Sequence, residues 1–106
     1  MALGVTLALR HLRGGRWPVV GIVHGLLGAV GLGLLVIALQ GPRRGDAMGV
    51  GSFGIAAAVL FGIALAFGPF IPLLKNRARR FAGLLMATHA TAAITAFVLL
   101  LAWVSL

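Results

Sequence analysis

The sequence predicts an all-α integral membrane protein with three transmembrane helices, and two observations support this fold class. Hydrophobic residues make up 61% of the 106 residues and charged residues only 9%, a balance that a soluble domain of this size could not cover with polar surface. The charged residues also fall in short groups that leave three long uncharged blocks, Trp17 to Leu39, Ala47 to Leu74 and Phe81 to Leu106. Each block exceeds the roughly 20 residues that a helix needs to cross a hydrocarbon core about 30 Å thick.

The first span is expected over residues 17–39. Gly14 and Gly15 precede it, and Pro18 falls in its first turn, where a missing backbone N–H has no partner to lose. The apolar residues 1–9 before it are too few to span a bilayer, and their charges follow rather than precede them, which is not the order of a signal peptide. We expect an interfacial lead-in there, either helical or disordered.

The second span is expected over residues 49–72. The run GPRRGD at 41–46 predicts a turn, which would make this helix antiparallel to the first. Pro69 and Pro72 predict that it breaks or kinks near its end. Small residues recur at every fourth position and predict a surface for close helix packing: Gly54, Ala58, Gly62 and Ala66.

The third span is expected over residues 81–104, so that residues 1–106 form a single membrane domain. Arginines 10, 13 and 16 and the four basic residues between 75 and 80 would share one side of the membrane. Arg43 and Arg44, partly offset by Asp46, would lie on the other. The positive-inside rule then places the N terminus in the cytoplasm and the C terminus outside, with helices 1 and 3 parallel and helix 2 antiparallel. The composition, rich in Ala, Gly, Leu and Arg, favours a bacterial inner membrane.

Two histidines, His24 and His89, are the only ionisable residues within the predicted spans. An ionisable side chain in hydrocarbon is costly enough to indicate a function. Counted from the basic residues that precede each span, both lie roughly 12 to 14 Å into their helices at about 1.5 Å per residue. Because helices 1 and 3 are predicted to be parallel, we expect the two imidazoles at matched depth.

The neighbours of the two histidines also match, with small residues four and seven positions further along each helix. These positions are Gly28 and Gly31 after His24, and Ala93 and Ala96 after His89. They lie within about 40° of the histidine direction on a helix, so each imidazole is expected beside a shallow strip. A flat ligand could lie on such strips, and so could a closely packed neighbouring helix.

Two imidazoles at one depth on parallel helices are what the two axial ligands of one metal ion require. Haem iron with two imidazoles is the commonest way for a cysteine-free pair of membrane helices to use histidine. The arginines expected at the cytoplasmic rim could pair with haem propionates, although a positive-inside protein would carry them in any case: Arg13, Arg16, Arg79 and Arg80.

The two histidine segments, RWPVVGIVHGLLGAVGLGLL and RRFAGLLMATHATAAITAFVLLLAW, carry a resemblance to a known class. They resemble the bis-histidine helices of small b-type cytochrome membrane proteins and membrane-anchor subunits. The similarity covers helices 1 and 3 only, and the chain departs from four-helix cytochromes of this kind in having three spans and a single histidine pair. The resemblance implies one haem b ligated by His24 and His89, and an electron-transfer role, either as a membrane protein by itself or as a subunit of a larger redox complex.

A second function from a different class stays open at this point. The chain could be a non-catalytic accessory or scaffolding subunit of a respiratory or photosynthetic membrane complex, binding chlorophyll through one histidine. Its expected partners in either case are membrane lipids and other membrane-protein subunits or a second copy.

Several other classes are disfavoured by the residue inventory. The chain has no cysteine, and its one acidic residue, Asp46, lies in a loop, which excludes a membrane-embedded acidic proton relay. The basic residues stand beside the spans, where they favour lipid head groups and not nucleic acid.

Overall fold

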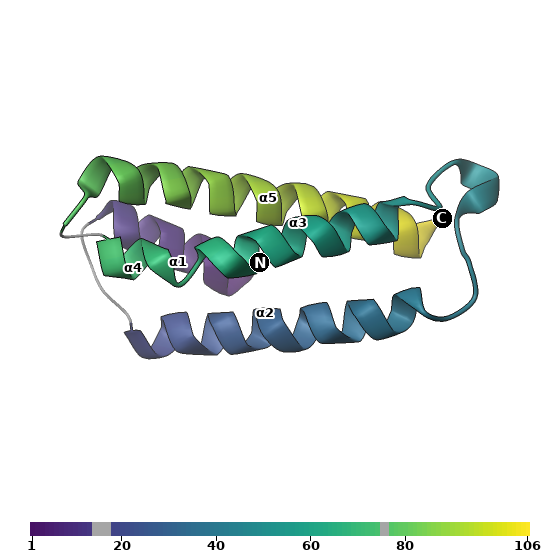
Figure 1. The fold of residues 1–106 in the computed structure, drawn as a ribbon, viewed down its shortest axis with the longest axis horizontal. Coiled ribbons are helices and arrows are strands. Elements are labelled where there is room, and N and C mark those ends of the chain that lie inside the picture. Colours follow the sequence, from purple (N-terminus) through teal and green to yellow (C-terminus); the bar gives the residue numbers. More distant parts are fainter. Residues whose placement is uncertain (14–17, 75–76) are drawn as a thin grey trace.

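The computed structural model describes residues 1–13, 18–74 and 77–106, and every regular element in these ranges is helical (Figure 1). The elements are α1 (Ala2–Leu12), α2 (Pro18–Leu39), the short 3₁₀ turn η1 (Asp46–Met48), α3 (Phe53–Phe67), α4 (Phe70–Leu74) and α5 (Arg79–Ser105). Within the described ranges, three helical stretches are long and apolar enough to cross a membrane: Val19–Leu39, Phe53–Leu74 and Arg79–Ser105. The prediction of three such helices is confirmed.

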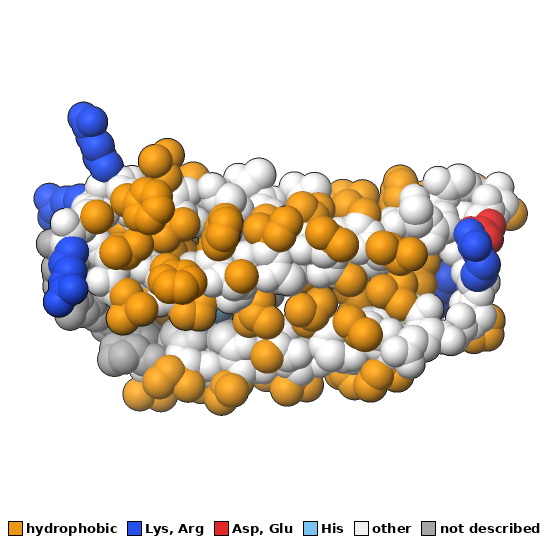
Figure 2. Space-filling view, in the orientation of Figure 1, with side chains coloured by type: hydrophobic (Ala, Val, Ile, Leu, Met, Phe, Trp, Pro, Cys, Tyr) orange, Lys and Arg blue, Asp and Glu red, His pale blue; other side chains and the backbone are white. Residues whose placement is uncertain are grey.

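The helices lie side by side in an elongated bundle that measures 48 × 22 × 19 Å. In Figure 1, α2 and α5 run in the same direction along the bundle, and α3 runs in the opposite direction. Figure 2 shows hydrophobic side chains over the length of this face and charged side chains gathered at its two ends. The longest dimension of the bundle, 48 Å, is close to the roughly 40–45 Å thickness of a bilayer with its head-group regions.

The connection between α2 and α3 is a compact turn that depends on two glycines. Gly45 and Gly49 flank η1 with φ angles of 78° and 75°, a left-handed conformation that glycine adopts without steric cost. Asp46 accepts a hydrogen bond from Arg43 Nε at 2.8 Å, which forms an exposed ion pair within the turn. This turn delays the start of α3 to Phe53, whereas the second span was expected from residue 49.

The second membrane-length stretch is divided where its prolines begin. α3 ends at Phe67, and α4 resumes at Phe70 after Gly68 and Pro69. Pro69 has no N–H to continue the backbone ladder, which accounts for the position of the break. The expected ladder of small residues is only partly used, because the buried residues of α3 are Gly54, Ala57 and Ala64. Gly62, a member of the expected ladder, has no atom within 4 Å of a Cβ built on it.

The face of α5 that packs against α3 is marked by residues seven positions apart. Ala82, Ala96 and Trp103 are buried, and His89 falls in the same series. Trp103 is 5% exposed and clusters with Leu35 of α2 and with Ala57 of α3, which is fully covered. The packed core of the bundle therefore lies between α3 and α5, and α2 joins it near the Trp103 end.

Helix α1 runs along the bundle, behind α3 and α4 in Figure 1, and it contacts α2. A Cβ built on Gly4 would lie 3.1 Å from Cε1 of His24, so the backbone of α1 reaches the first histidine. An interfacial lead-in, either helical or disordered, was expected here, and the structure shows a helix. The structure places these apolar residues against α2, where they cover part of its surface.

Candidate functional site

The two span histidines lie next to each other, one on α2 and one on α5. Their ring centroids are 6.1 Å apart and the ring planes are inclined by 76°. Both side chains are half-buried. The matched depth inferred from the sequence therefore corresponds to a close pair of imidazoles in the structure.

His89 is held by the backbone of α3. Its Nδ1 lies 2.7 Å from the carbonyl oxygen of Ala64. A carbonyl can only accept, so Nδ1 carries the proton and donates it, and Nε2 is left with its lone pair. The same carbonyl accepts the backbone N–H of Gly68 at 2.9 Å, in the last turn of α3. In the neutral ring, this contact selects the tautomer with the proton on Nδ1.

A glycine stands against the edge of each ring. The Cβ position of Gly4 is 3.1 Å from Cε1 of His24, and that of Gly68 is 3.2 Å from Cε1 of His89. Contacts this short leave little room for a side chain at either position. Helix α1 and the break between α3 and α4 therefore border the imidazole pair on two sides.

The two expected strips of small residues differ in the structure. On α2, a Cβ added at Gly28 or Gly31 would meet no atom within 4 Å, so this strip is open. On α5, Ala96 is fully covered and Ala93 is half-buried. The reason is the seven-residue series of α5, which turns the surface that carries His89 and Ala96 onto α3. Only the α2 strip offers the open surface that was expected on both helices.

The arginines expected at a cofactor rim lie at one end of the bundle. Arg13, Arg79 and Arg80 are exposed. Arg13 is nine positions from Gly4, which is about half a turn around a helix at 100° per residue. Its side chain is therefore on the side of α1 that faces away from His24. Arg16 and Trp17 lie outside the described residues.

Two parts of the site carry no signal that the sequence reasoning used. The carbonyl of Ala64 is a backbone group, and no residue type announces it. Pro69 did signal a helix end nearby, where backbone carbonyls become accessible. Gly4 lay in the expected interfacial lead-in and was not linked to His24, because the packing of α1 on α2 follows from tertiary contacts.

Among the described residues, no group of three or more His, Cys, Asp or Glu side chains lies close enough to share a metal ion. Asp46, the only acidic residue, belongs to the η1 turn and pairs with Arg43. Within the part of the chain that the structure describes, the two imidazoles therefore have no carboxylate partner.

The arrangement defines a class and no more: an all-helical chain with three helices suited to crossing a membrane and a histidine pair between two of them. Comparison with protein-family models, curated proteins and solved structures finds no match.

Proposed function

We propose that this chain is a multi-pass membrane protein that holds one haem b between His24 and His89 and carries electrons within a larger redox complex. The observation that supports the proposal best is the placement of the two imidazoles, 6.1 Å between centroids, with Nε2 of His89 free. The proposal includes the orientation expected from the positive-inside rule, N terminus inside and C terminus outside, in a bacterial inner membrane.

The ring separation is compatible with two axial ligands of one metal ion. An imidazole nitrogen lies about 2.0–2.1 Å from a bound first-row metal, so two rings on opposite sides of one ion have centres about 6 Å apart. Direct edge-to-face contact between two rings spans about 4.5–7 Å and fits the distance as well. The tautomer of His89 favours ligation, because axial histidines commonly donate Nδ1–H to a backbone carbonyl.

The donor set also favours a macrocycle over a bare ion. A metal ion held by side chains alone takes about four ligands, and the described residues gather two. Haem brings four nitrogens of its own and needs only two ligands from the protein, which is the number that the histidine pair offers. Room for the flat group comes from α2, where Gly28 and Gly31 are open, and not from the covered surface of Ala96 on α5.

In this proposal the residues of the chain bind, orient and shield. His24 and His89 would hold the iron, and the Ala64 carbonyl orients the His89 ring through Nδ1. The backbone at Gly4 lies against the Cε1 edge of His24, and the backbone at Gly68 lies against the Cε1 edge of His89, so each restricts the rotation of that ring. When bound, haem supplies a one-electron couple in a low-dielectric setting.

The test is an optical spectrum of the purified full chain, produced in a host that supplies haem. We expect the reduced-minus-oxidised difference spectrum of a low-spin b haem. His24→Ala and His89→Ala should each abolish it because both imidazoles would be needed to hold the haem iron in its low-spin state. His11→Ala, which changes the third histidine of the chain, should leave it intact. A colourless protein that keeps its helical content would contradict the proposal.

The same spectrum also tests the open strip with a matched pair of variants. Gly28→Leu adds bulk on the side of α2 that bears His24. Gly33→Leu adds the same bulk half a turn away, nine residues from His24, where a Cβ likewise meets no atom within 4 Å. We expect haem retention to fall in the first variant only. Equal losses in both would mean that the strip does not receive the cofactor.

One observation favours the second candidate function, an accessory subunit. The glycines of α2 at 21, 25, 28 and 31 all have open space at their Cβ positions. A row of small residues of this kind lets a helix of another subunit approach closely. In this case a colourless preparation that co-purifies with larger membrane subunits is expected, and loss of those subunits on Gly28→Leu would support it.

A further inference from the structure

The two ends of the bundle differ in how their positive charges are used. At the end formed by η1 and the C terminus of α5, Arg43 pairs with Asp46. Arg44 donates to the carbonyl of Val104 at 3.1 Å and lies over the Trp103 ring, 5.4 Å from its centroid. At the other end, the exposed arginines among the described residues are 10, 13, 77, 79 and 80, and the chain has no acidic residue there. Figure 2 shows blue side chains gathered at this end.

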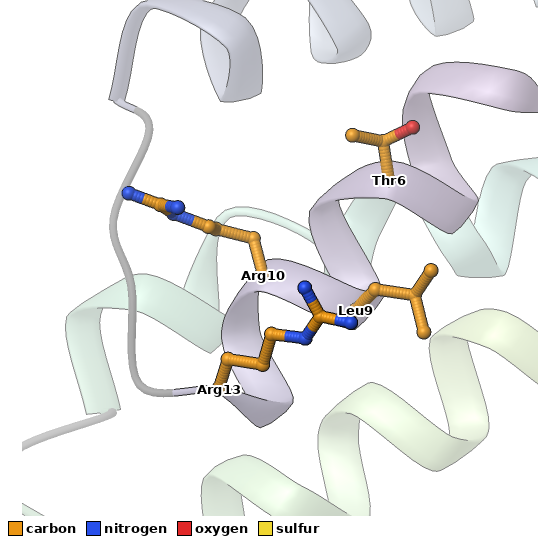
Figure 3. Close-up of a pocket in the computed structure, with 4 residues that line it drawn as sticks. All are labelled: Thr6, Leu9, Arg10 and Arg13. Atoms are coloured by element: carbon orange, nitrogen blue, oxygen red, sulfur yellow. The ribbon is translucent and has the colours of Figure 1, made fainter.

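A shallow pocket of about 180 Å³ lies at this basic end, on α1. It is lined by Thr6, Leu9, Arg10 and Arg13 (Figure 3). These positions are three, four and seven residues apart, which brings them onto one side of the helix. In Figure 3 the guanidinium of Arg13 turns back along α1 toward Leu9. The pocket therefore combines two cationic groups with an apolar wall.

The pocket faces away from the histidine pair. Gly4 marks the side of α1 that touches His24, and the pocket residues lie from about 140° to 240° around the helix from it. The hydroxyl of Thr6 already donates to the carbonyl of Ala2 at 2.9 Å. Its oxygen keeps the capacity to accept, and the guanidinium group of Arg13 supplies donors to the pocket. A ligand here would be independent of a cofactor held by the histidines.

We propose that this pocket binds an anionic phospholipid, with its phosphate at Arg13 and an acyl chain along Leu9 and Val5. Guanidinium groups bind phosphate oxygens through charged, often paired hydrogen bonds. Leu9 is 52% exposed and Val5 is 53% exposed, so an apolar track leads from Arg13 along α1. A free phosphate ion would use Arg13 but not the track, whereas a phospholipid with a negative head group uses both.

The experiment measures lipid binding to the purified full chain in detergent by native mass spectrometry. Phosphatidylglycerol should bind at least about tenfold more tightly than phosphatidylcholine with the same acyl chains, the ratio that one charged contact supplies. Inorganic phosphate at the same concentration should not displace it. Equal binding of the two lipids, or displacement by inorganic phosphate, would overturn the proposal.

Matched variants separate this pocket from the general positive charge of the end. Arg13→Gln and Arg77→Gln remove the same charge from two exposed arginines, but only Arg13 lines the pocket. We expect about a tenfold loss of phosphatidylglycerol affinity for Arg13→Gln and less than a twofold loss for Arg77→Gln. Leu9→Ser, which keeps the net charge, should also weaken lipid binding. Equal losses for the two arginine variants would show diffuse attraction and overturn the site.

Discussion

The interface between α3 and α5 and the surface of α2 that carries Gly28 both contain the small residue types Gly and Ala. The first surface is closely packed, whereas the second is open. Between α3 and α5, Ala57 and Ala96 are fully covered, and Gly54 meets the Trp103 ring. Along α2, Gly28 and Gly31 have open space in front of them. A small residue is therefore required in the first region, where the backbones approach each other, whereas in the second region a larger side chain would meet no atom of the bundle within 4 Å of its Cβ.

The comparison shows why a small-residue pattern alone does not reveal its purpose. Close packing and ligand room both call for Gly and Ala at helical spacing. The difference lies in what stands opposite each position, which is a property of the assembled bundle. His89 belongs to the packed region and His24 to the open one, so the histidine pair sits at the boundary between them.

The largest expected effect comes from the same substitution at two glycines, one in each region. Gly54→Ala would place a Cβ 2.7 Å from Cε2 of Trp103 and 2.8 Å from Cδ2 of Leu39. We expect a loss of about 1–3 kcal/mol in the free energy of unfolding, because a close-packed interior must shift to accept it. Gly28→Ala should gain about 0.5–1 kcal/mol from the lower chain entropy of alanine.

These values can be measured by reversible unfolding in mixed detergent and SDS micelles, followed by circular dichroism. Opposite signs for the two variants would sharpen the distinction between the packed and open regions. A similar loss at both positions would break it, since it would mean that α2 is packed as tightly as α3.

A smaller effect is expected at the boundary, from Gly68→Ala. The new Cβ would lie 3.2 Å from Cε1 of His89. Gly68 also adopts helical angles, φ −51° and ψ −51°, directly before Pro69, where a residue with a Cβ is disfavoured. Together these should cost about 1–2 kcal/mol, on the scale of one strained rotamer or backbone position.

The matched control on the same stretch is Gly62→Ala, whose Cβ meets no atom within 4 Å and should be neutral or stabilising. Nitrogen NMR of the histidine rings provides the second measurement. In the native chain we expect His89 as the Nδ1–H tautomer, and Gly68→Ala should disturb that signal while Gly62→Ala leaves it unchanged. An unchanged His89 signal in both would mean that Gly68 does not restrict the ring.

Much of the fold was predictable because hydrophobicity and helix-breaking residues are local properties of the sequence. The uncharged blocks mark three membrane-length helices, and Pro69 marks the break between α3 and α4. The depth of His24 and His89 followed from helical rise alone. These inferences need only the chain near each residue, and the closeness of the two rings in the structure agrees with them.

The rest depended on rotation and pairing of helices, which a single sequence specifies weakly. The ladder of Gly54 and Gly62 was expected to form one packing face, but the structure buries Gly54 with Ala57 and Ala64 and leaves Gly62 open. A rotation of one helix by a fraction of a turn makes this difference. The carbonyl of Ala64 and the approach of Gly4 to His24 are likewise consequences of tertiary packing.

The smallest expected effect lies at the Trp103 end of the packed region, where two neighbouring arginines have different roles. Arg44 lies over the Trp103 ring and donates to the Val104 carbonyl. Arg44→Gln should cost about 0.5–1 kcal/mol, the scale of an exposed cation–π contact. Arg43→Gln breaks an ion pair whose side chains are 84% and 50% exposed, and should cost about half as much or less because solvent screens it.

Fluorescence distinguishes these two variants more sharply than stability, because only one arginine touches the ring. In a Trp17→Phe background, the emission comes from Trp103 alone. Trp103 is 5% exposed with Arg44 in place, and Arg44→Gln uncovers one face of its ring. The emission of Trp103 should therefore shift to the red, and the ring should become more accessible to a polar quencher. Arg43→Gln should leave the emission unchanged. Equal shifts would mean that the whole η1 turn, and not Arg44 itself, closes this end of the packed region.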